Sequence, residues 1–353
     1  MSDDNNLDRR QFLGAAAMTV AALSSRRNAA ESDALPLSSR TSEASVGIHR
    51  PSTVASFRPI KQIDAGELNV GYAEDGPANG QPVVLLHGWP YDIHSYADVA
   101  PLLASAGYRV IVPHLRGHGT TRFRSVDTFR NAQQAVVALD ILALMDALKI
   151  ERPIFAGYDW GARTANIIAA LWPERCRAMV SVNGYIINNL ERNKLPLPPK
   201  VEQGWWYQYY FATERGRIGY EANRREFARL IWKNVSPKWD FDDATFERST
   251  ASFDNPDYVP IVIHNYRWRL SLVPGDPKHD DIERRLAATP AIGVPTITLD
   301  GDSDGVAPAT DGTSYAARFS GRRTHRIIKG AGHNLPQEAP RAFADAVIEV
   351  AGY

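Results

Sequence analysis

Five consecutive residues near the middle of the chain, Gly157-Tyr158-Asp159-Trp160-Gly161, set a carboxylate between two glycines. A short apolar run precedes them and a helical pattern follows, which predicts a sharp turn from a strand into a helix; glycines are needed there because the neighbouring segments pack closely. The dipole at the start of the helix favours the ionised form of Asp159. We interpret Asp159 as a nucleophile. Simple capping of the helix is the alternative, although capping requires neither glycine.

Backbone donors for a developing negative charge are predicted on both sides of this turn. The sequence LLHGWP closes another apolar run, and Trp89 follows its His-Gly pair, while Trp160 follows Asp159 directly. Two opposed N–H groups form an oxyanion hole, which stabilises negative charge on a reacting carbonyl oxygen. We therefore expect the backbone N–H groups of Trp89 and Trp160 to form such a hole.

Two later motifs supply an acid and a base. GDSDGV and GAGHNLP each follow an apolar run, so the chain order is Asp159, Asp304, His333. Nucleophile, acid and then histidine is the order of one known type of catalytic triad. Asp300 and Asp302 compete for the place of the acid. For His333 the alternative is a histidine buried in the core, but its position in a glycine-flanked loop after a strand favours a functional role.

The elements that must position these residues can be predicted from periodicity. Short apolar runs bounded by glycine or proline are typical of buried parallel strands. They cover Pro82–Gly88, Tyr108–His114, Arg152–Asp159, Ala178–Gly184, Val294–Gly301 and His325–His333. Helical patterns lie between them, so we predict an α/β fold with a mostly parallel sheet flanked by helices. Residues 185–290 lack comparable strands and are rich in Trp, Tyr, Arg and Asn, which predicts a helical insertion over the carboxyl edge of the sheet.

Taken together, the Gly-x-Asp-x-Gly turn, HGWP and the C-terminal Gly-His pair resemble the α/β-hydrolase fold family. The aspartate resembles the branch that contains epoxide hydrolases and haloalkane dehalogenases, and the epoxide hydrolases are the more similar group. The resemblance covers the chain from Phe57 to the C-terminus. It implies a core of residues 57–184 and 291–353 with a helical cap at 185–290. It also favours Asp304 as the acid, because Asp304 stands three positions after Gly301.

An aspartate nucleophile implies displacement at a saturated carbon, since a carboxylate is a poor nucleophile for acyl transfer but can form an alkyl ester. His333, oriented by Asp304, would then activate the water that hydrolyses the ester of Asp159. The two N–H donors would stabilise the oxyanion formed at the carbonyl of that ester. This chemistry predicts no cofactor and no metal, and it disfavours an ordinary esterase or lipase.

The predicted cap distinguishes two leaving groups. An epoxide oxygen leaves as an alkoxide and needs a proton donor, such as a tyrosine in a dry pocket, whereas a halide needs only N–H donors. WWYQYYF and HNYRWR resemble the two places where epoxide hydrolases keep their ring-opening tyrosines, which implies Tyr207 and Tyr266. Tyr209 and Tyr210 compete with Tyr207, and packing within the cap is the alternative for all of them. The indole of Trp160 keeps halide as an open alternative.

Two other functions stay open at this point. A haloalkane or haloacid dehalogenase would use the same Asp159, Asp304 and His333. The turn also resembles the Asp-Arg-Gly-x-Arg motif of fluoroacetate dehalogenases, but this chain keeps only the second arginine, Arg163. We expect Arg163 to form a salt bridge on its helix. The third candidate is a non-catalytic receptor for a small hydrophobic ligand, although a receptor has no need of a hydrolytic base.

The composition and the amino terminus bear on partners and location. The 353 residues include 40 basic and 40 acidic side chains, which argues against nucleic acid and favours a small, uncharged, hydrophobic substrate. Residues 1–30, with Arg9-Arg10 before a short apolar run, resemble a twin-arginine export signal. We therefore predict a periplasmic or secreted protein, with residues 31–56 as a linker and no stable membrane insertion after signal removal. The sequence carries no sign of oligomeric state.

Overall fold

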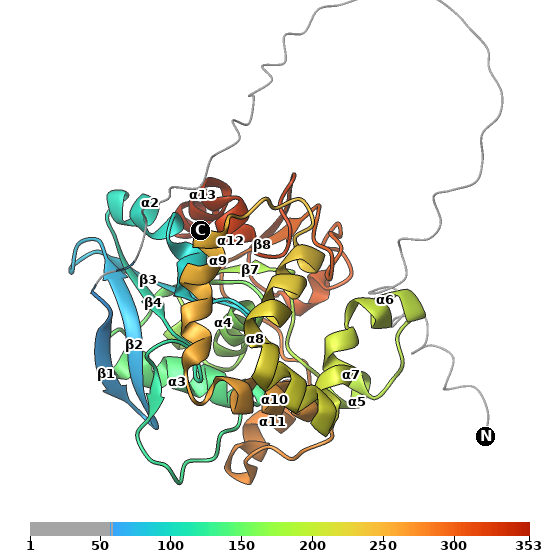
Figure 1. Ribbon diagram of the computed structural model, residues 1–353. Helices are drawn as coiled ribbons and strands as arrows, with labels where there is room; N and C mark the ends of the chain where they lie inside the picture. The colour runs from blue at the N-terminus through green and yellow to red at the C-terminus, as the bar shows by residue number, and fades with distance from the viewer. Residues whose placement is uncertain (1–56, 58) are drawn as a thin grey trace, which may run out of the picture. The chain divides into compact units, whose positions relative to one another are not determined.

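The computed structural model describes residue 57 and residues 59–353, and it contains one mixed sheet (Figure 1). The order of the strands across the sheet is β1-β2-β4-β3-β6-β7-β8-β9, with β5 paired to β2. The strands are β1 (Lys61–Ala65), β2 (Leu68–Asp75), β3 (Gln81–Leu86), β4 (Tyr108–Pro113), β5 (Arg122–Phe123), β6 (Ile154–Gly157), β7 (Ala178–Val182), β8 (Thr296–Gly301) and β9 (Arg323–Ile328).

Six strands pair with one another in parallel: β3 with β4 and β6, β6 with β7, β7 with β8, and β8 with β9. They coincide with the six apolar runs, because strands covered on both faces are apolar along their whole length. β6, β7 and β8 are buried at every position. Their carboxyl ends meet at one edge, so the loops after β3, β6, β8 and β9 lie together.

The sheet is wider than the apolar runs indicate. β1, β2 and β5 form an antiparallel group at one side, where β2 pairs with β1, β4 and β5. The alternation of strand and helix does not reveal this group because hairpin-connected strands need no intervening helix. β1 is also largely exposed, and a half-solvated edge strand carries no continuous apolar run.

Helices cover the sheet in two sets. α3 packs against α4, and α13 packs against α2; Figure 1 shows the two pairs on opposite sides of the strands. Together with the short helix α12, the bounds of these helices are α2 (Val99–Ser105), α3 (Gln134–Ala147), α4 (Trp160–Leu171), α12 (Leu335–Glu338) and α13 (Pro340–Val350). Short 3-10 helices complete this part of the chain: η1 (Ile93–Tyr96), η2 (Pro173–Arg175) and η5 (Ala316–Arg318).

The segment between β7 and β8 contains only helices and loops, and we call residues 185–290 the cap. Its helices are α5 (Leu190–Asn193), α6 (Pro199–Gly204), α7 (Trp206–Ala212), α8 (Glu214–Val235), α9 (Asp243–Thr250), α10 (Tyr258–Arg269) and α11 (Asp280–Ala287), with η3 (Ala251–Asp254) and η4 (Pro277–His279). α7 packs against α8 and α10, and aromatic rings fill the space between them. The interior of the cap is therefore rich in aromatic rings, and it is continuous with the core beneath it.

The predicted export signal at residues 1–30 and the linker at 31–56 lie outside the described residues. From residue 59 onward, every helix is too short or too polar to cross a lipid bilayer.

Candidate active site

The turn between β6 and α4 holds Asp159 in a backbone conformation that residues other than glycine rarely adopt, with φ of +50° and ψ of −123°. The turn is this tight because α4 begins one residue later and packs against the preceding strands. A Cβ on Gly161 would lie 1.9 Å from the backbone oxygen of Leu86, and a Cβ on Gly157 would lie 2.6 Å from the backbone of Gly161. Strain of this kind persists only where the surrounding structure enforces it, and it is concentrated at functional sites.

The loop after β3 delivers a backbone donor to this carboxylate. The N–H of Trp89 donates to Oδ1 of Asp159 over 2.8 Å. Gly88 permits the approach, since a Cβ there would lie 2.6 Å from the Cβ of Asp159. The N–H of Trp160, in the first turn of α4, has no acceptor within the described part of the chain. The structure thus places both predicted oxyanion-hole residues beside Asp159, with one donor engaged and one available.

His333 lies between the two carboxylates that the sequence predicts. Its Nδ1 is 2.8 Å from Oδ2 of Asp304, and its Nε2 is 3.8 Å from Oδ2 of Asp159. Oδ1 of Asp304 accepts from the N–H groups of Val306 and Ala307, each over 2.9 Å. The carboxylate of Asp304 is therefore fixed on both oxygens, and it holds the imidazole with Nε2 directed at Asp159.

The two competing acids are engaged elsewhere. Asp300 accepts hydrogen bonds from the backbone and the hydroxyl of Thr310. Asp302 accepts from the hydroxyl of Ser303 and from the N–H of Gly330. Neither carboxylate contacts His333, so the geometry singles out Asp304.

The charges of this group are strongly coupled. Burial disfavours the charged form of His333, but the negative charges of Asp304 and Asp159 outweigh it and raise the pKa of His333 to about 10. Burial likewise opposes ionisation of Asp159, yet His333, Arg163 and the Trp89 N–H together lower the pKa of Asp159. The resting site therefore holds an imidazolium between two carboxylates. Loss of the charge on Asp159, as in an ester, would remove one of the two groups that keep His333 protonated.

Two cap tyrosines pack on Trp89, whose N–H binds the nucleophile. Tyr207, from α7, and Tyr266, from α10, are buried with their ring centroids 5.4 Å apart, and the indole of Trp89 lies 5.2 Å and 5.1 Å from them, respectively. Burial raises the pKa of Tyr207 to about 12 and raises the pKa of Tyr266 well above its usual value. The charge on Asp159 contributes to both shifts, so both phenols lie within electrostatic reach of the nucleophile and are protonated at neutral pH.

The two competing tyrosines lie away from this group. Tyr209 is 48% exposed, and its hydroxyl binds Glu202 on the surface of the cap. Tyr210 stacks on Phe227, 5.9 Å between centroids. The assignment of Tyr207 over both is thus supported by position.

Ser236 and Glu338 form hydrogen bonds with the loop that carries His333, and neither residue was predicted from the sequence. Ser236, at the end of α8, donates to Oε1 of Glu338 over 2.6 Å and accepts from the N–H of His333 over 3.1 Å. Oε2 of Glu338 accepts from the N–H of Gly332 over 2.7 Å, and Oε1 accepts from that of Asn334 over 3.1 Å. The glutamate five residues after the histidine was the available signal, but nothing in the sequence links it to a serine about one hundred residues earlier.

The expectation for Arg163 was wrong. Its side chain makes no ion pair in the described structure; its Nε donates to the backbone oxygen of Ile186 over 3.1 Å, and the residue is 7% exposed. Arg163 lies in the first turn of α4, and its side chain reaches the backbone of Ile186 at the start of the cap. Cys176 is free and buried in the core.

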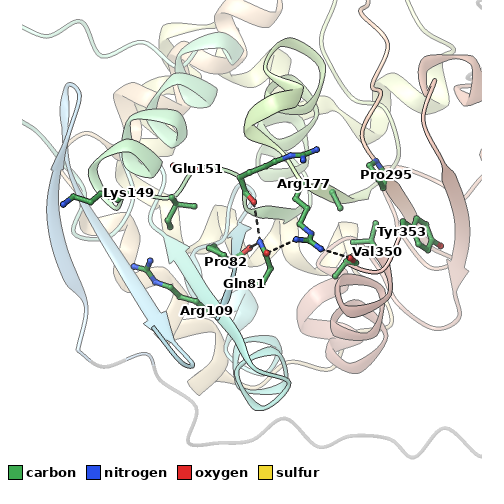
Figure 2. A pocket seen from close by; sticks show the side chains of 13 residues that line it. Gln81, Pro82, Arg109, Lys149, Glu151, Arg177, Pro295, Val350 and Tyr353 are labelled. Atoms are coloured by element: carbon green, nitrogen blue, oxygen red, sulfur yellow. Dashed lines mark hydrogen bonds between the residues drawn. The ribbon is translucent and has the colours of Figure 1, made fainter. Parts of the chain in front are cut away.

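A hollow of about 730 Å³ lies at the opposite edge of the sheet, where β3 and β4 begin (Figure 2). Gln81, Arg109, Arg177 and Tyr353 are among the residues that line it. Arg177 donates to the Gln81 side chain over 3.1 Å, as Figure 2 shows. None of the predicted site residues lines this hollow, so we place the candidate active site at the carboxyl edge of the sheet and beneath the cap. No group of three or more His, Cys, Asp or Glu residues in the described chain is arranged to hold a metal ion.

The family profile described as the alpha/beta hydrolase fold matches residues 81–340, which include every predicted site residue. The chain belongs to the α/β-hydrolase fold family. A crystal structure from Klebsiella pneumoniae subsp. pneumoniae, named as a candidate epoxide hydrolase, superimposes with a TM-score of 0.83 and 55% sequence identity over 84% of this chain and 98% of that one. These matches confirm the fold predicted from the strand pattern.

Relatives of known name in this α/β-hydrolase family include two kinds of enzyme. Epoxide hydrolase A of Mycobacterium tuberculosis is 25% identical over 314 residues, which cover 81% of this chain and 95% of that protein. A haloalkane dehalogenase of Mycobacterium marinum is 30% identical over 211 residues, which cover 59% of this chain and 67% of that protein. The chain is therefore a hydrolase, and its relatives include the two groups that the aspartate at the turn predicts.

Proposed function

We propose that this α/β hydrolase opens epoxides to vicinal diols through an ester on Asp159. The observation that carries the proposal is the burial of two phenols, Tyr207 and Tyr266, against the indole of Trp89, whose backbone N–H binds the nucleophile. A protein that displaced halide would gain nothing from phenolic acids, whereas an epoxide oxygen requires a proton as its bond to carbon breaks. The names of the M. tuberculosis and K. pneumoniae proteins support the same reading.

In the first step, Oδ2 of Asp159 attacks one epoxide carbon, while Oδ1 stays bound to the N–H of Trp89. A C–O bond to the enzyme forms, the ring C–O bond breaks, and the released oxygen takes a proton from Tyr266 or Tyr207. The deep burial of these phenols keeps water from competing with them. His333 is protonated during this step and takes no proton.

In the second step, the ester is hydrolysed. Esterification has removed the charge of Asp159, so the pKa of His333 falls. The proton that His333 loses replaces the one that the tyrosine gave to the epoxide oxygen, and the neutral imidazole can then take a proton from water. The hydroxide attacks the ester carbonyl, and the N–H groups of Trp89 and Trp160 stabilise the resulting oxyanion. Collapse breaks the acyl C–O bond, and the leaving diol oxygen takes the proton that His333 abstracted from water. The carboxyl group of Asp159, which now carries the oxygen of the attacking water, returns its own proton to His333 and restores the resting site.

Haloalkane dehalogenation is the second candidate, and one observation favours it. The indole Nε1 of Trp160 is buried and has no acceptor among the described residues. An N–H in this state can bind a halide leaving from the carbon that Asp159 attacks. The centroid of this indole ring lies 6.2 Å from that of the Tyr266 ring. A halide bound to the indole and an epoxide oxygen bound to Tyr266 would therefore occupy the same space.

The deciding experiment traps the ester. The His333→Gln variant, incubated separately with styrene oxide and with a bromoalkane and then weighed intact, should carry a stable adduct from the epoxide and none from the haloalkane. His279→Gln on the surface of the cap is the matched control and should turn over without a detectable adduct. An adduct from the bromoalkane alone would overturn the proposal in favour of dehalogenation.

We further propose that the protein acts outside the cytoplasm on a small hydrophobic substrate. Support comes from the twin-arginine-type segment around Arg9-Arg10. Replacement of both arginines by lysine should retain the protein in the cytoplasm when cell fractions are compared; continued export would remove this proposal.

A further inference from the structure

The loop after β3 is held from the cap at two consecutive residues, Trp89 and Pro90. The indole Nε1 of Trp89 donates to the hydroxyl of Tyr220 over 2.9 Å. The indole Nε1 of Trp232 donates to the backbone oxygen of Pro90 over 2.7 Å. All four residues are buried, and Tyr220 and Trp232 both belong to α8. One cap helix therefore holds the core loop that carries a predicted oxyanion donor.

Close packing of α8 on α7 sets the position of Tyr220. Gly216 permits this approach, because a Cβ there would lie 1.6 Å from the backbone oxygen of Tyr210. The ring of Phe211, on α7, then packs on the ring of Tyr220 with 4.8 Å between centroids. α7 also carries Tyr207, so the helix that supplies a proposed proton donor and the helix that holds Trp89 form one packed unit.

Trp89 connects this unit to the nucleophile. Its backbone N–H donates to Oδ1 of Asp159 over 2.8 Å. In the described part of the chain this is the only hydrogen bond from Trp89 or Pro90 to the core; the other two go to α8. A catalytic donor has to stay within about 0.5 Å of its productive position, which requires hydrogen bonds and packing that fix its own side chain. For Trp89 those contacts come from the cap.

We propose that Tyr220 and Trp232 are positioning residues that hold the backbone N–H of Trp89 against the ester of Asp159. This inference rests on the proposed function and adds two residues to its second step. The oxyanion forms only when water attacks the ester, so loss of either contact slows ester hydrolysis more than ring opening. In ring opening, Oδ2 of Asp159 attacks carbon, and this oxygen does not contact Trp89.

The two steps can be timed separately with styrene oxide and rapid quenching. Tyr220→Phe keeps the ring and removes the acceptor. It should slow ester hydrolysis by about 10- to 100-fold and ring opening by less than about threefold, so that intact mass shows accumulated ester during turnover. Trp232→Phe should act in the same direction, and it carries the test if circular dichroism shows that Tyr220→Phe is unfolded. Tyr185→Phe, which loses one hydrogen bond to the backbone oxygen of Pro290, is the matched control and should change neither step.

Two further measurements separate positioning from support of the fold. In a Trp89→Phe background, which lacks the indole donor, Tyr220→Phe should cause no further slowing, because the bond is already absent. In protein labelled with heavy nitrogen, the indole resonance of Trp89 is identified by its loss in Trp89→Phe. This resonance should shift and its proton should exchange faster with solvent in Tyr220→Phe, but not in Tyr185→Phe.

Several outcomes would overturn this role for α8 while leaving epoxide hydrolysis intact. They are equal slowing of the two steps, additive effects of Tyr220→Phe and Trp89→Phe, and an indole resonance of Trp89 that does not change in Tyr220→Phe. If the wild-type protein opens no epoxide, the proposed function falls. The comparison of variants is then made with a bromoalkane, whose ester on Asp159 would be hydrolysed in the same way, and accumulation of that ester in Tyr220→Phe would support the positioning role.

Discussion

The core and the cap hold their parts of the site by different means. In the core, Asp304 and His333 are fixed by hydrogen bonds on nearly every polar atom, including the N–H groups of Val306 and Ala307 on the acid. In the cap, Tyr207 and Tyr266 are fixed by ring packing against one another and against Trp89. The core thus positions the charged side chains of the site. The cap positions its two neutral phenols and excludes water from them.

This difference follows from the chemistry proposed for each side. A buried charge is stable only with hydrogen bonds, so the charge-carrying groups sit on short loops at strand ends, where backbone N–H groups converge. A phenol that must remain protonated needs the reverse, an apolar environment that disfavours phenolate. Damage to the core should therefore stop covalent chemistry altogether, whereas damage to the cap should slow one step.

The largest effect is expected at the nucleophile. Asp159→Asn should lower kcat by about 10⁴-fold or more, because an amide cannot form the ester, and intact mass should reveal no adduct. In wild-type protein, turnover in heavy-oxygen water should place label on the side chain of Asp159. Asp302→Asn, the same substitution in the neighbouring loop, is the control and should retain activity. An unlabelled Asp159 after many turnovers would exclude the ester.

A smaller and selective effect is expected in the cap. The double variant Tyr207→Phe, Tyr266→Phe should slow epoxide opening by about 10²- to 10⁴-fold, because the alkoxide loses its proton donors. Hydrolysis of an ester already formed should be little changed, which rapid-quench measurements can separate from ring opening. The control is Tyr209→Phe, which alters an exposed phenol bonded to Glu202. If the double variant opens epoxides at the wild-type rate, the two tyrosines only line the pocket and do not donate the proton.

The central sheet and the proximity of the three proposed triad residues could be predicted because both depend on short local patterns in the sequence. Each triad residue follows its own apolar strand, and parallel strands bring their carboxyl ends to one edge. Asp159, Asp304 and His333 therefore meet although 174 positions separate the first from the last. β1 was not predicted in this way because an exposed edge strand carries no continuous apolar run, and β2 was not predicted because its antiparallel pairing with β1 needs no intervening helix.

What the sequence could not predict depends on contacts between distant side chains. Ser236 meets Glu338 only because α8 ends over the histidine loop. Arg163 binds the backbone of Ile186 in the cap instead of forming the salt bridge expected on its helix. In each case the residue type permits several environments, and packing of the cap on the core selects one.

The two steps should also separate with pH. Ring opening needs ionised Asp159, whose pKa is lowered, so this step should persist as the pH falls. Ester hydrolysis needs neutral His333, which is present above the pKa that this histidine has in the ester and is lost as the pH falls through it. Below that pKa, hydrolysis should slow by about tenfold per pH unit, and the ester should accumulate in wild-type protein quenched during turnover. A constant ester fraction from about pH 5 to about pH 8 would show that His333 is not the base. The tyrosines should remain protonated throughout this range, since burial raises the pKa of each.

The smallest effect is expected where the core and the cap join. Ser236 ends α8 in the cap, and its hydroxyl links the N–H of His333 to Glu338. Ser236→Ala should lower the free energy of unfolding by about 1 kcal/mol, the value of one buried hydrogen bond. It should also slow ester hydrolysis by less than about tenfold, because Asp304 still orients the imidazole. Ser105→Ala on α2, which loses an exposed hydrogen bond to Pro101, is the control for stability. A slowing confined to ester hydrolysis would show that the cap helps to position the base as well as the acid, whereas an equal slowing of ring opening would show that Ser236 serves only to seat the cap.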